Sequence, residues 1–257
     1  MGQRKMDKRQ LGQTGITVSR LGLGTVKFGR NEDVKYPHGF EIPDENALAD
    51  LLALAADLGI NLLDTAPSYG TSEERLGRLL KGQRENWVIV GKAGEEFIDG
   101  KSEFNFTPGH FEKSLERSLK RLQTDYLDVL LIHSSGNDME ILGNHGLIEK
   151  LHDFKRRGLV RAVGASTKTP EGGIMALELL DVVMVAYNPE YTDEKSVLDY
   201  ATTNNKGALV KKALASGHAG DIGKSLQFAL SHPGATAVIT GTINPVHLRE
   251  NCRLAAT

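Results

Sequence analysis

Eight short apolar runs recur along this chain, separated by segments of helical periodicity, and this alternation constrains the fold more than any other feature. The spacing between runs is about 25 to 35 residues, the length of one strand–helix unit. Several runs are apolar on both faces, which is typical of buried parallel strands. Eight such units favour an α/β fold of the (β/α)8 TIM-barrel type over an open doubly wound sheet. We expect strands at residues 21–25, 60–63, 87–91, 126–132, 159–165, 181–187, 207–210 and 236–240.

Local signals agree with this pattern and add one feature before the first strand. Asp44 is placed to cap a helix that begins at the next residue, and Gly59 is placed to end it. Residues 110–122 form a second amphipathic helix, and Lys224–Ser225 open the helix after the seventh strand. Residues 9–19 predict an N-terminal β-hairpin that turns at Thr14–Gly15 and plugs the bottom of the barrel. Because no linker interrupts the pattern, we expect one barrel domain over residues 1–257.

Composition excludes several classes of protein. The formal charge of −2 gives no attraction to nucleic acid or to an anionic membrane. No secretory signal and no apolar stretch of membrane-spanning length is present. Cys252 is the single cysteine, which excludes internal disulfides and suits a reducing compartment. We therefore expect a cytoplasmic protein, monomeric or weakly oligomeric, that contacts neither nucleic acid nor membrane.

Ionisable side chains lie at the ends of three successive predicted strands. The second strand ends at Asp64, the third at Lys92 and the fourth at His133, and Tyr69 follows in the loop after the first of them. Each residue alone has an ordinary structural role, as a helix cap, a loop charge or a packing aromatic. Because the active sites of such barrels lie at the carboxyl ends of the strands, their coincidence on one rim favours a catalytic group.

These four side chains suit the reduction of a carbonyl group. A free phenol has a pKa of about 10, and a cation beside it makes proton release easier. Lys92 is expected to lower the pKa of Tyr69 in this way, and Asp64 to keep the ammonium charged. A neutral His133 would donate a hydrogen bond to the carbonyl oxygen and orient it. The hydride must then come from a cofactor.

In these motifs the chain resembles the aldo-keto reductase family. The matching stretches are LGLGT (21–25), GINLLDTAPSYGTSEERLG (59–77), VGKAG (90–94), SLERSLKRLQTDYLDVLLIH (114–133), VGAS (163–166) and ITGT with HLREN (239–251). The resemblance implies a (β/α)8 barrel and a catalytic tetrad of Asp64, Tyr69, Lys92 and His133. It also implies NADP(H) as cofactor, with NAD(H) not excluded.

The resemblance implies a set of cofactor contacts at the strand ends and at the last helix. These positions are Gly24, Thr25, Asp64, Ser166, Thr167, Lys212, Leu214, Ser216, Thr242, His247, Glu250 and Asn251. Four positions depart from the family pattern. Thr167 replaces an Asn, Met184 a Gln, Lys211 the aromatic residue that stacks on nicotinamide, and His247 an Arg that grips the 2′-phosphate. These changes leave the tetrad intact but alter the cofactor site.

Three other motifs point to different functions and are weaker. Gly22-Leu23-Gly24 lacks the third glycine of a dinucleotide-binding loop. In HAGDIGKS (218–225) a histidine stands where a P-loop needs its first glycine. The group His133, Asp138, Glu140 and His145 matches no zinc spacing, so we expect no metal site.

The sequence therefore predicts an NADP(H)-dependent oxidoreductase that converts an aldehyde, ketone or sugar-like carbonyl to an alcohol, or the reverse. The alternative is a barrel that binds the nicotinamide nucleotide and senses redox state without turnover. Segments 95–106 and 134–145 are expected to be the loops that select the substrate. Because the chain ends soon after HLREN (247–251), we expect an open substrate pocket.

Overall fold

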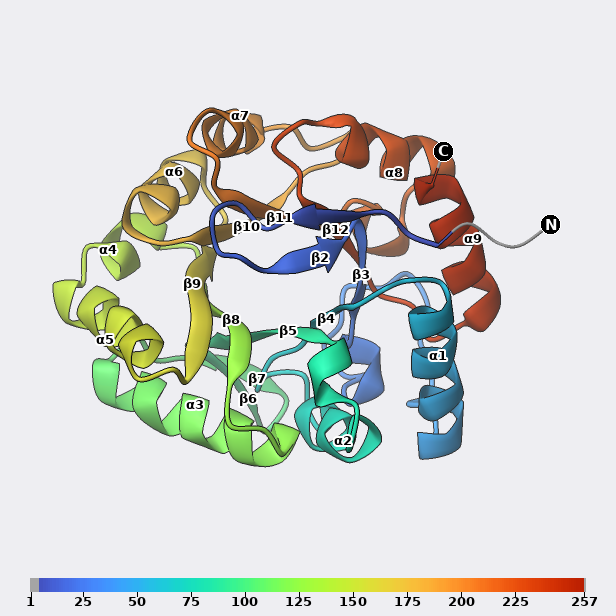
Figure 1. The fold of residues 1–257 in the computed structure, drawn as a ribbon, viewed down its shortest axis with the longest axis horizontal. Helices are drawn as coiled ribbons and strands as arrows, with labels where there is room; N and C mark the ends of the chain where they lie inside the picture. Colours follow the sequence, from blue (N-terminus) through green and yellow to red (C-terminus); the bar gives the residue numbers. More distant parts are fainter. Residues whose placement is uncertain (1–4, 257) are drawn as a thin grey trace.

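Eight parallel strands close into a barrel in the computed structural model, which describes residues 5–256. Around the barrel the strands follow their order in the chain (Figure 1). They are β3 (Leu21–Gly24), β4 (Leu62–Asp64), β5 (Val88–Ala93), β8 (Leu127–His133), β9 (Val160–Ser166), β10 (Val182–Ala186), β11 (Gly207–Lys211) and β12 (Ala237–Thr240). All eight predicted strands are confirmed, and so is the (β/α)8 class.

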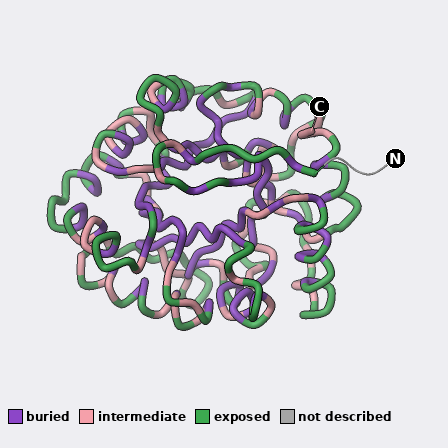
Figure 2. The backbone as a smooth tube through the Cα atoms, in the orientation of Figure 1, coloured by how far each residue is buried: buried purple, intermediate pink, exposed green. Residues whose placement is uncertain are grey.

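Helices surround this barrel and face it with their apolar sides. They are α1 (Glu45–Asp57), α2 (Ser72–Leu79), α3 (Pro108–Leu122), α4 (Asp138–Leu142), α5 (His145–Arg156), α6 (Pro170–Leu179), α7 (Lys195–Thr203), α8 (Ile222–Ser231) and α9 (Pro245–Ala255). Three 3-10 turns accompany them, at Val26–Phe28, Arg84–Asn86 and Ala215–Gly217. Buried residues line the strands and the inner helix faces, and exposed residues form the outer rim (Figure 2).

Helix ends follow the local chemistry of the sequence. The Asp44 side chain accepts from the amide of Ala47 at 2.8 Å and caps α1, while Gly59 after its end has φ +85°. Both expectations are confirmed. Helix α3 begins two residues before the predicted start, because Thr107 caps it and Pro108 fits the first turn. Helix α8 likewise begins before Lys224, since Asp221 is its cap.

The N-terminal hairpin covers one end of the barrel. Strands β1 (Lys8–Gln10) and β2 (Thr17–Ser19) pair antiparallel across a turn in which Gly15 has φ +71°. Leu11, Ile16 and Val18 are buried in one cluster with side chains from inside the barrel. A side chain at Gly12 would lie 2.4 Å from the amide nitrogen of Gly207, the first residue of β11. The hairpin therefore closes the amino-terminal end of the strands, as predicted.

A second hairpin was not predicted. The segment expected to be a substrate loop pairs antiparallel as β6 (Glu95–Ile98) and β7 (Lys101–Phe104). Asp99 and Gly100, at its tip, both have positive φ, 48° and 77°, as a two-residue turn of this kind requires. The hairpin follows β5 directly, so Glu95 lies three residues beyond Lys92. Among residues 5–256, no helix has the length and apolar character needed to cross a membrane.

Candidate active site at the strand ends

Three neighbouring strands bring their terminal side chains to one rim of the barrel. Strand β4 pairs with β5, and β5 pairs with β8. Asp64 is the last residue of β4 and His133 the last of β8, while Lys92 is next to last in β5. Parallel register places these positions at the carboxyl ends of the strands. The structure thus gathers the residues that the sequence singled out.

Lys92 is the centre of the group. Its ammonium forms an ion pair with the Asp64 carboxylate, and it donates to the carbonyl oxygen of Thr65 and the hydroxyl of Tyr69, each at 3.2 Å. The side chains of Lys92 and Asp64 are 2% and 7% exposed. A charge buried this deeply needs partners, because isolated burial costs several kcal/mol, on the order of 3–5. Pairing with Asp64 therefore holds a full cation beside the phenol.

Tyr69 is held by a tight loop between β4 and α2. The Tyr69 amide donates to the carbonyl of Ala66 at 3.0 Å, and the Tyr69 carbonyl accepts from Ser72 at 3.2 Å. Gly70 has φ +60°, and a side chain there would lie 2.1 Å from the carbonyl oxygen of Gly29. Only glycine fits this close approach. The Pro-Ser-Tyr-Gly sequence therefore ends the strand and turns the phenol back towards Lys92.

The pKa of Tyr69 lies well above its ordinary value of 10.0. Burial is the main cause, and the negative charges of Asp64 and Glu95 add to it, whereas Arg30 acts in the opposite direction. The expectation that this pKa lies below 10.0 is therefore wrong, because desolvation of the phenol and the nearby carboxylates favour the protonated form. The phenol stays protonated at neutral pH and has a proton to give.

Thr25 holds the last residue of β4 in place through hydrogen bonds. Its amide and its hydroxyl both donate to the Asp64 carbonyl oxygen at 2.9 Å, and the Ser72 hydroxyl donates to Thr25 at 2.8 Å. All of these side chains are buried. The hydrogen bonds of Thr25, which was expected to contact the cofactor, are thus made to the protein. They fix the backbone that carries Asp64.

His133 has a partner that the sequence interpretation missed. Its Nδ1 lies 2.8 Å from Oε2 of Glu95, and the two side chains are 18% and 14% exposed. Burial lowers the pKa of His133 from 6.5, although Glu95 raises it. The pKa of Glu95 falls to about 2 despite burial, because His133, Ser102 and Arg30 favour the carboxylate. The Asp99–Gly100 turn is the sequence signal that would have found the hairpin that begins at Glu95.

A cavity of about 310 Å³ adjoins this rim at the ends of β9, β10 and β11. Lysines 35, 168, 211 and 212 line it, together with Ser216. The pKa of Lys212 is lowered by burial and by repulsion from Lys35 and Lys168. Three non-glycine residues of the adjoining loop, Lys212, Ala215 and Ser216, have positive φ of 56°, 46° and 58°. Such strained backbone is typical of ligand sites, and a cluster of cations suits an anionic ligand.

Lys211 organises the inner wall of this cavity. Its ammonium donates to the Ser166 hydroxyl at 2.8 Å and to the Thr167 carbonyl at 2.7 Å. Burial lowers the pKa of Lys211 to about 8, while the buried carboxylate of Glu194 opposes this shift. Glu194 accepts from the Ala186 amide at 2.9 Å. Met184 is buried in the cluster of side chains inside the barrel.

The remaining expected cofactor positions lie around the same end of the barrel. Gly24 ends β3, Leu214 packs against the outer core, and Thr242 is buried and accepts from the Asn244 amide at 3.1 Å. On α9, His247 and Glu250 are exposed and Asn251 is buried. A side chain at Gly241 would lie 2.8 Å from the hydroxyl of Tyr36, so the loop before α1 also reaches this rim.

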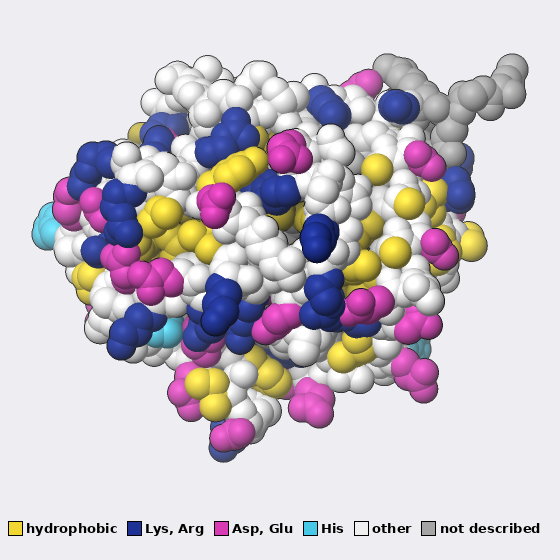
Figure 3. Space-filling view, turned by 60° about the horizontal axis from the view of Figure 1, so that its bottom comes forward, with side chains coloured by type: hydrophobic (Ala, Val, Ile, Leu, Met, Phe, Trp, Pro, Cys, Tyr) yellow, Lys and Arg dark blue, Asp and Glu magenta, His cyan; other side chains and the backbone are white. Residues whose placement is uncertain are grey.

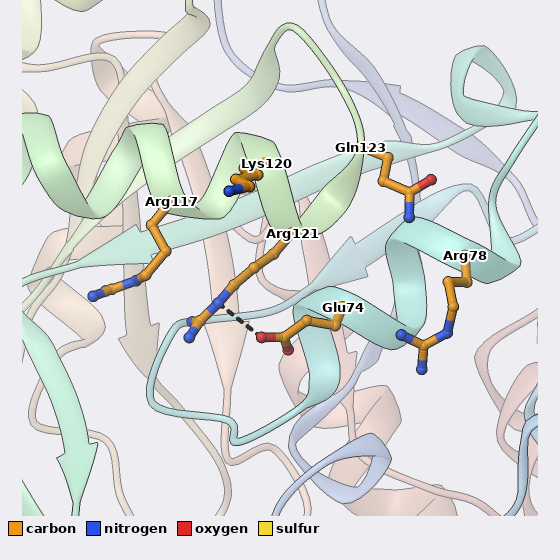
Figure 4. A pocket seen from close by; sticks show the side chains of 6 residues that line it. All are labelled: Glu74, Arg78, Arg117, Lys120, Arg121 and Gln123. Carbon is orange, nitrogen blue, oxygen red and sulfur yellow. Dashed lines mark ion pairs between the residues drawn. The ribbon is translucent and has the colours of Figure 1, made fainter.

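A second cavity, of about 400 Å³, lies on the outside of the barrel between α2 and α3 (Figure 4). Its guanidinium groups are already paired: Arg78 with Glu45, Arg117 with Glu96, and Arg121 with Glu74, the last at 2.8 Å. No strand end reaches it. The compensated charges make it a poor candidate for the active site.

Two further observations concern ligands of other kinds. On the face shown in Figure 3, Lys and Arg side chains alternate with Asp and Glu, so this face offers no continuous basic track for a nucleic-acid backbone. Within the described part of the chain, no group of three or more His, Cys, Asp or Glu residues is arranged to hold a metal ion. Asp138 instead accepts from the amides of Lys168 and Thr169, both at 2.9 Å.

Comparison with known proteins agrees with the fold. The sequence model of the Aldo/keto reductase family matches residues 20–221. A crystal structure of a putative aldo-keto reductase from Pseudomonas aeruginosa superposes with a TM-score of 0.90 at 54% identity, covering 97% of this chain and 94% of that one. The Bacillus subtilis uncharacterised oxidoreductase YqkF is 27% identical, over 97% of this chain and 91% of its own length. The NADH-specific methylglyoxal reductase of Escherichia coli is 31% identical over 77% of this chain and 62% of its own.

Proposed function

The chain belongs to the aldo/keto reductase family, and from that premise we propose that it is an NADP(H)-dependent oxidoreductase interconverting a small aldehyde, ketone or sugar-like carbonyl and its alcohol. The observation that carries the proposal is the hydrogen bond of 3.2 Å from the Lys92 ammonium to the Tyr69 hydroxyl, with Asp64 paired behind it. A phenol, a buried cation and an imidazole on one rim are the groups that an oxygen needs as it gains negative charge and then a proton.

Tyr69 is the proposed proton donor. Because its pKa is raised, the hydroxyl is protonated over the neutral range and transfers its proton to the substrate oxygen. The Lys92 ammonium, already donating to the phenol oxygen, stabilises the phenolate that this transfer leaves. Asp64 neutralises Lys92 and keeps it in place. His133 contacts the substrate oxygen and orients the carbonyl.

The residues of the rim fit a phosphorylated dinucleotide. Lys168 and Lys212 would hold its phosphates, because their cavity gathers positive charge that the protein only partly neutralises. When bound, the nicotinamide cofactor supplies the hydride. Thr242, His247 and Arg249 stand near the start of α9 and would meet a 2′-phosphate, with Glu250 and Asn251 beside them for the adenosine. We propose that NADP(H) is preferred and that NAD(H) is also accepted.

The second candidate function is a barrel that binds the cofactor and senses redox state without turnover. It is favoured by one observation: the Lys211 ammonium donates to the Ser166 hydroxyl and the Thr167 carbonyl at the position where the resemblance implies an aromatic residue. A nicotinamide there would meet a cation instead of a stacking ring.

One experiment separates the two functions. The purified protein is mixed with NADPH or NADH and a panel of aldehydes, ketones and sugars, and cofactor absorbance is followed while cofactor binding is measured by fluorescence. Turnover with at least one carbonyl, faster with NADPH, supports the reductase. Tight binding of both cofactors without turnover of any compound supports the sensor.

A further inference from the structure

The hairpin β6–β7 brings a carboxylate to one nitrogen of the His133 ring. Oε2 of Glu95 lies 2.8 Å from Nδ1, within ion-pair distance, although Nδ1 makes no hydrogen bond of regular geometry in the structure. The carboxylate is itself fixed, because Ser102 on the opposite strand donates to Oε1 at 2.6 Å and Ser68 donates to Oε2 at 3.4 Å. Glu95 is thus held by two hydroxyl groups against the imidazole.

This contact decides where the imidazole carries its proton. A carboxylate can only accept, and Nδ1 without a hydrogen can only accept as well. Two acceptors at this distance repel each other, so the nitrogen that faces Glu95 carries the hydrogen. A neutral imidazole has a single N–H, and therefore Nε2, the nitrogen left for a substrate, has none.

We propose that Glu95 is a positioning residue which holds the proton of His133 on Nδ1, so that Nε2 donates to a carbonyl oxygen only when the ring is an imidazolium. The neutral ring instead accepts at Nε2, which suits the hydroxyl of an alcohol. This inference rests on the proposed function in assigning Nε2 to the substrate. It differs from the expectation that a neutral His133 donates to the carbonyl.

The charges around the ring determine which form is present. Glu95 on β6 favours the imidazolium, whereas burial and the cations Lys92 on β5 and Lys211 on β11 oppose it, and the net result is a pKa below 6.5. Arg30, in the loop after β3, favours the Glu95 carboxylate, whose pKa of about 2 keeps it charged at any working pH. Tyr69, whose ring centre is 6.3 Å from that of His133, stays neutral. The imidazolium therefore forms only in the acidic range, and carbonyl reduction should gain from it there.

Nitrogen NMR of the whole protein tests the inference without any turnover. Ring ¹⁵N shifts report which nitrogen is protonated, and the His133 signals are those that a His133→Asn variant lacks. We expect the neutral ring of the wild-type protein to carry its hydrogen on Nδ1. In Glu95→Gln the pKa of His133 should fall by about one unit or more, because the opposite charge is gone, and the Nε2–H form should appear.

Glu96→Gln is the matched control. Glu96 is the adjacent carboxylate, but it pairs with Arg117 and lies 3.5 Å from His110. This variant should leave both His133 signals and their pKa unchanged. An Nε2–H neutral form in the wild-type protein would overturn the inference even if Glu95→Gln failed to fold. Unchanged His133 shifts and pKa in a folded Glu95→Gln protein would overturn it as well.

The pH dependence of kcat/KM is a second test, because a purely structural role of Glu95 would not change it. In the wild-type enzyme, kcat/KM for reduction should rise as pH falls through the pKa of His133, whereas in Glu95→Gln that rise should be lost. A pH profile identical in both proteins would contradict the inference. If no carbonyl is turned over, the proposed function fails, but the NMR result still stands on its own.

Discussion

Replacing Lys92 by Met should destabilise the protein strongly, since it leaves the Asp64 carboxylate buried without its cation. The two side chains are 7% and 2% exposed, so water does not replace the lost partner. Removing one partner of a buried ion pair costs about 3–5 kcal/mol. For a chain of this size each kcal/mol lowers Tm by roughly 2–4 °C, so the expected loss is about 6–20 °C.

The assay is urea denaturation followed by circular dichroism, with a thermal scan as a second measure. The matched control is the double variant Asp64→Asn/Lys92→Met, which removes the stranded charge together with the cation. It should recover at least half of the free energy of unfolding that the single variant loses. If Lys92→Met lost less than about 1 kcal/mol, Asp64 would not be a buried charge that depends on Lys92.

Two further predictions concern the cofactor. Because the pKa of Lys211 is about 8, its positive charge is present below that pH and lost above it, so the dissociation constant of NADPH should rise as pH increases through about 8. Lys211→Met should abolish this dependence; an unchanged pH curve in the variant would rule out Lys211 as its origin. His247→Arg should tighten NADPH binding by about 1–2 kcal/mol through a charge-assisted hydrogen bond to the 2′-phosphate, and leave NADH nearly unaffected. Fluorescence titration measures both effects, and equal gains for NADPH and NADH in His247→Arg would place that residue away from the 2′-phosphate.

The barrel itself was predictable because its signals are local. Short apolar runs, Asp44 as a cap and Gly59 as a stop each act within a few residues, and the structure confirms them. The β6–β7 hairpin was missed although its turn residues, Asp99 and Gly100, carry a local signal. The strands beside them are mostly exposed and polar, so they lack the apolar alternation by which strands are usually recognised.

The site was predictable in its members but not in its electrostatics. Strand ends of a barrel meet on one rim, so Asp64, Lys92 and His133 were expected together, and the structure places them so. Whether the pKa of Tyr69 is raised or lowered depends on how far the folded chain excludes water from the phenol. No spacing in the sequence reveals this. Glu95, the first residue of β6, contacts His133, the last residue of β8, across a sequence separation that no local pattern reveals. Contacts of this kind are set by tertiary structure.

The central claim is that Tyr69 donates the proton, and a comparison of two phenylalanine variants tests it most directly. Tyr69→Phe keeps the ring but removes the hydroxyl that accepts from Lys92 at 3.2 Å. Tyr36→Phe is the matched control, since Tyr36 reaches the same rim beside Gly241 and its pKa is also raised, to about 12.

The measurement is kcat for NADPH-dependent reduction, alongside the NADPH dissociation constant, in both variants and the wild-type enzyme. The account predicts that Tyr69→Phe loses about 100-fold or more in kcat, the range for loss of a general acid, with cofactor affinity unchanged. Tyr36→Phe should stay within about threefold of the wild-type kcat, since it removes no proton donor. Near-full activity in Tyr69→Phe, or an equal loss in both variants, would contradict the assignment of Tyr69 as the acid.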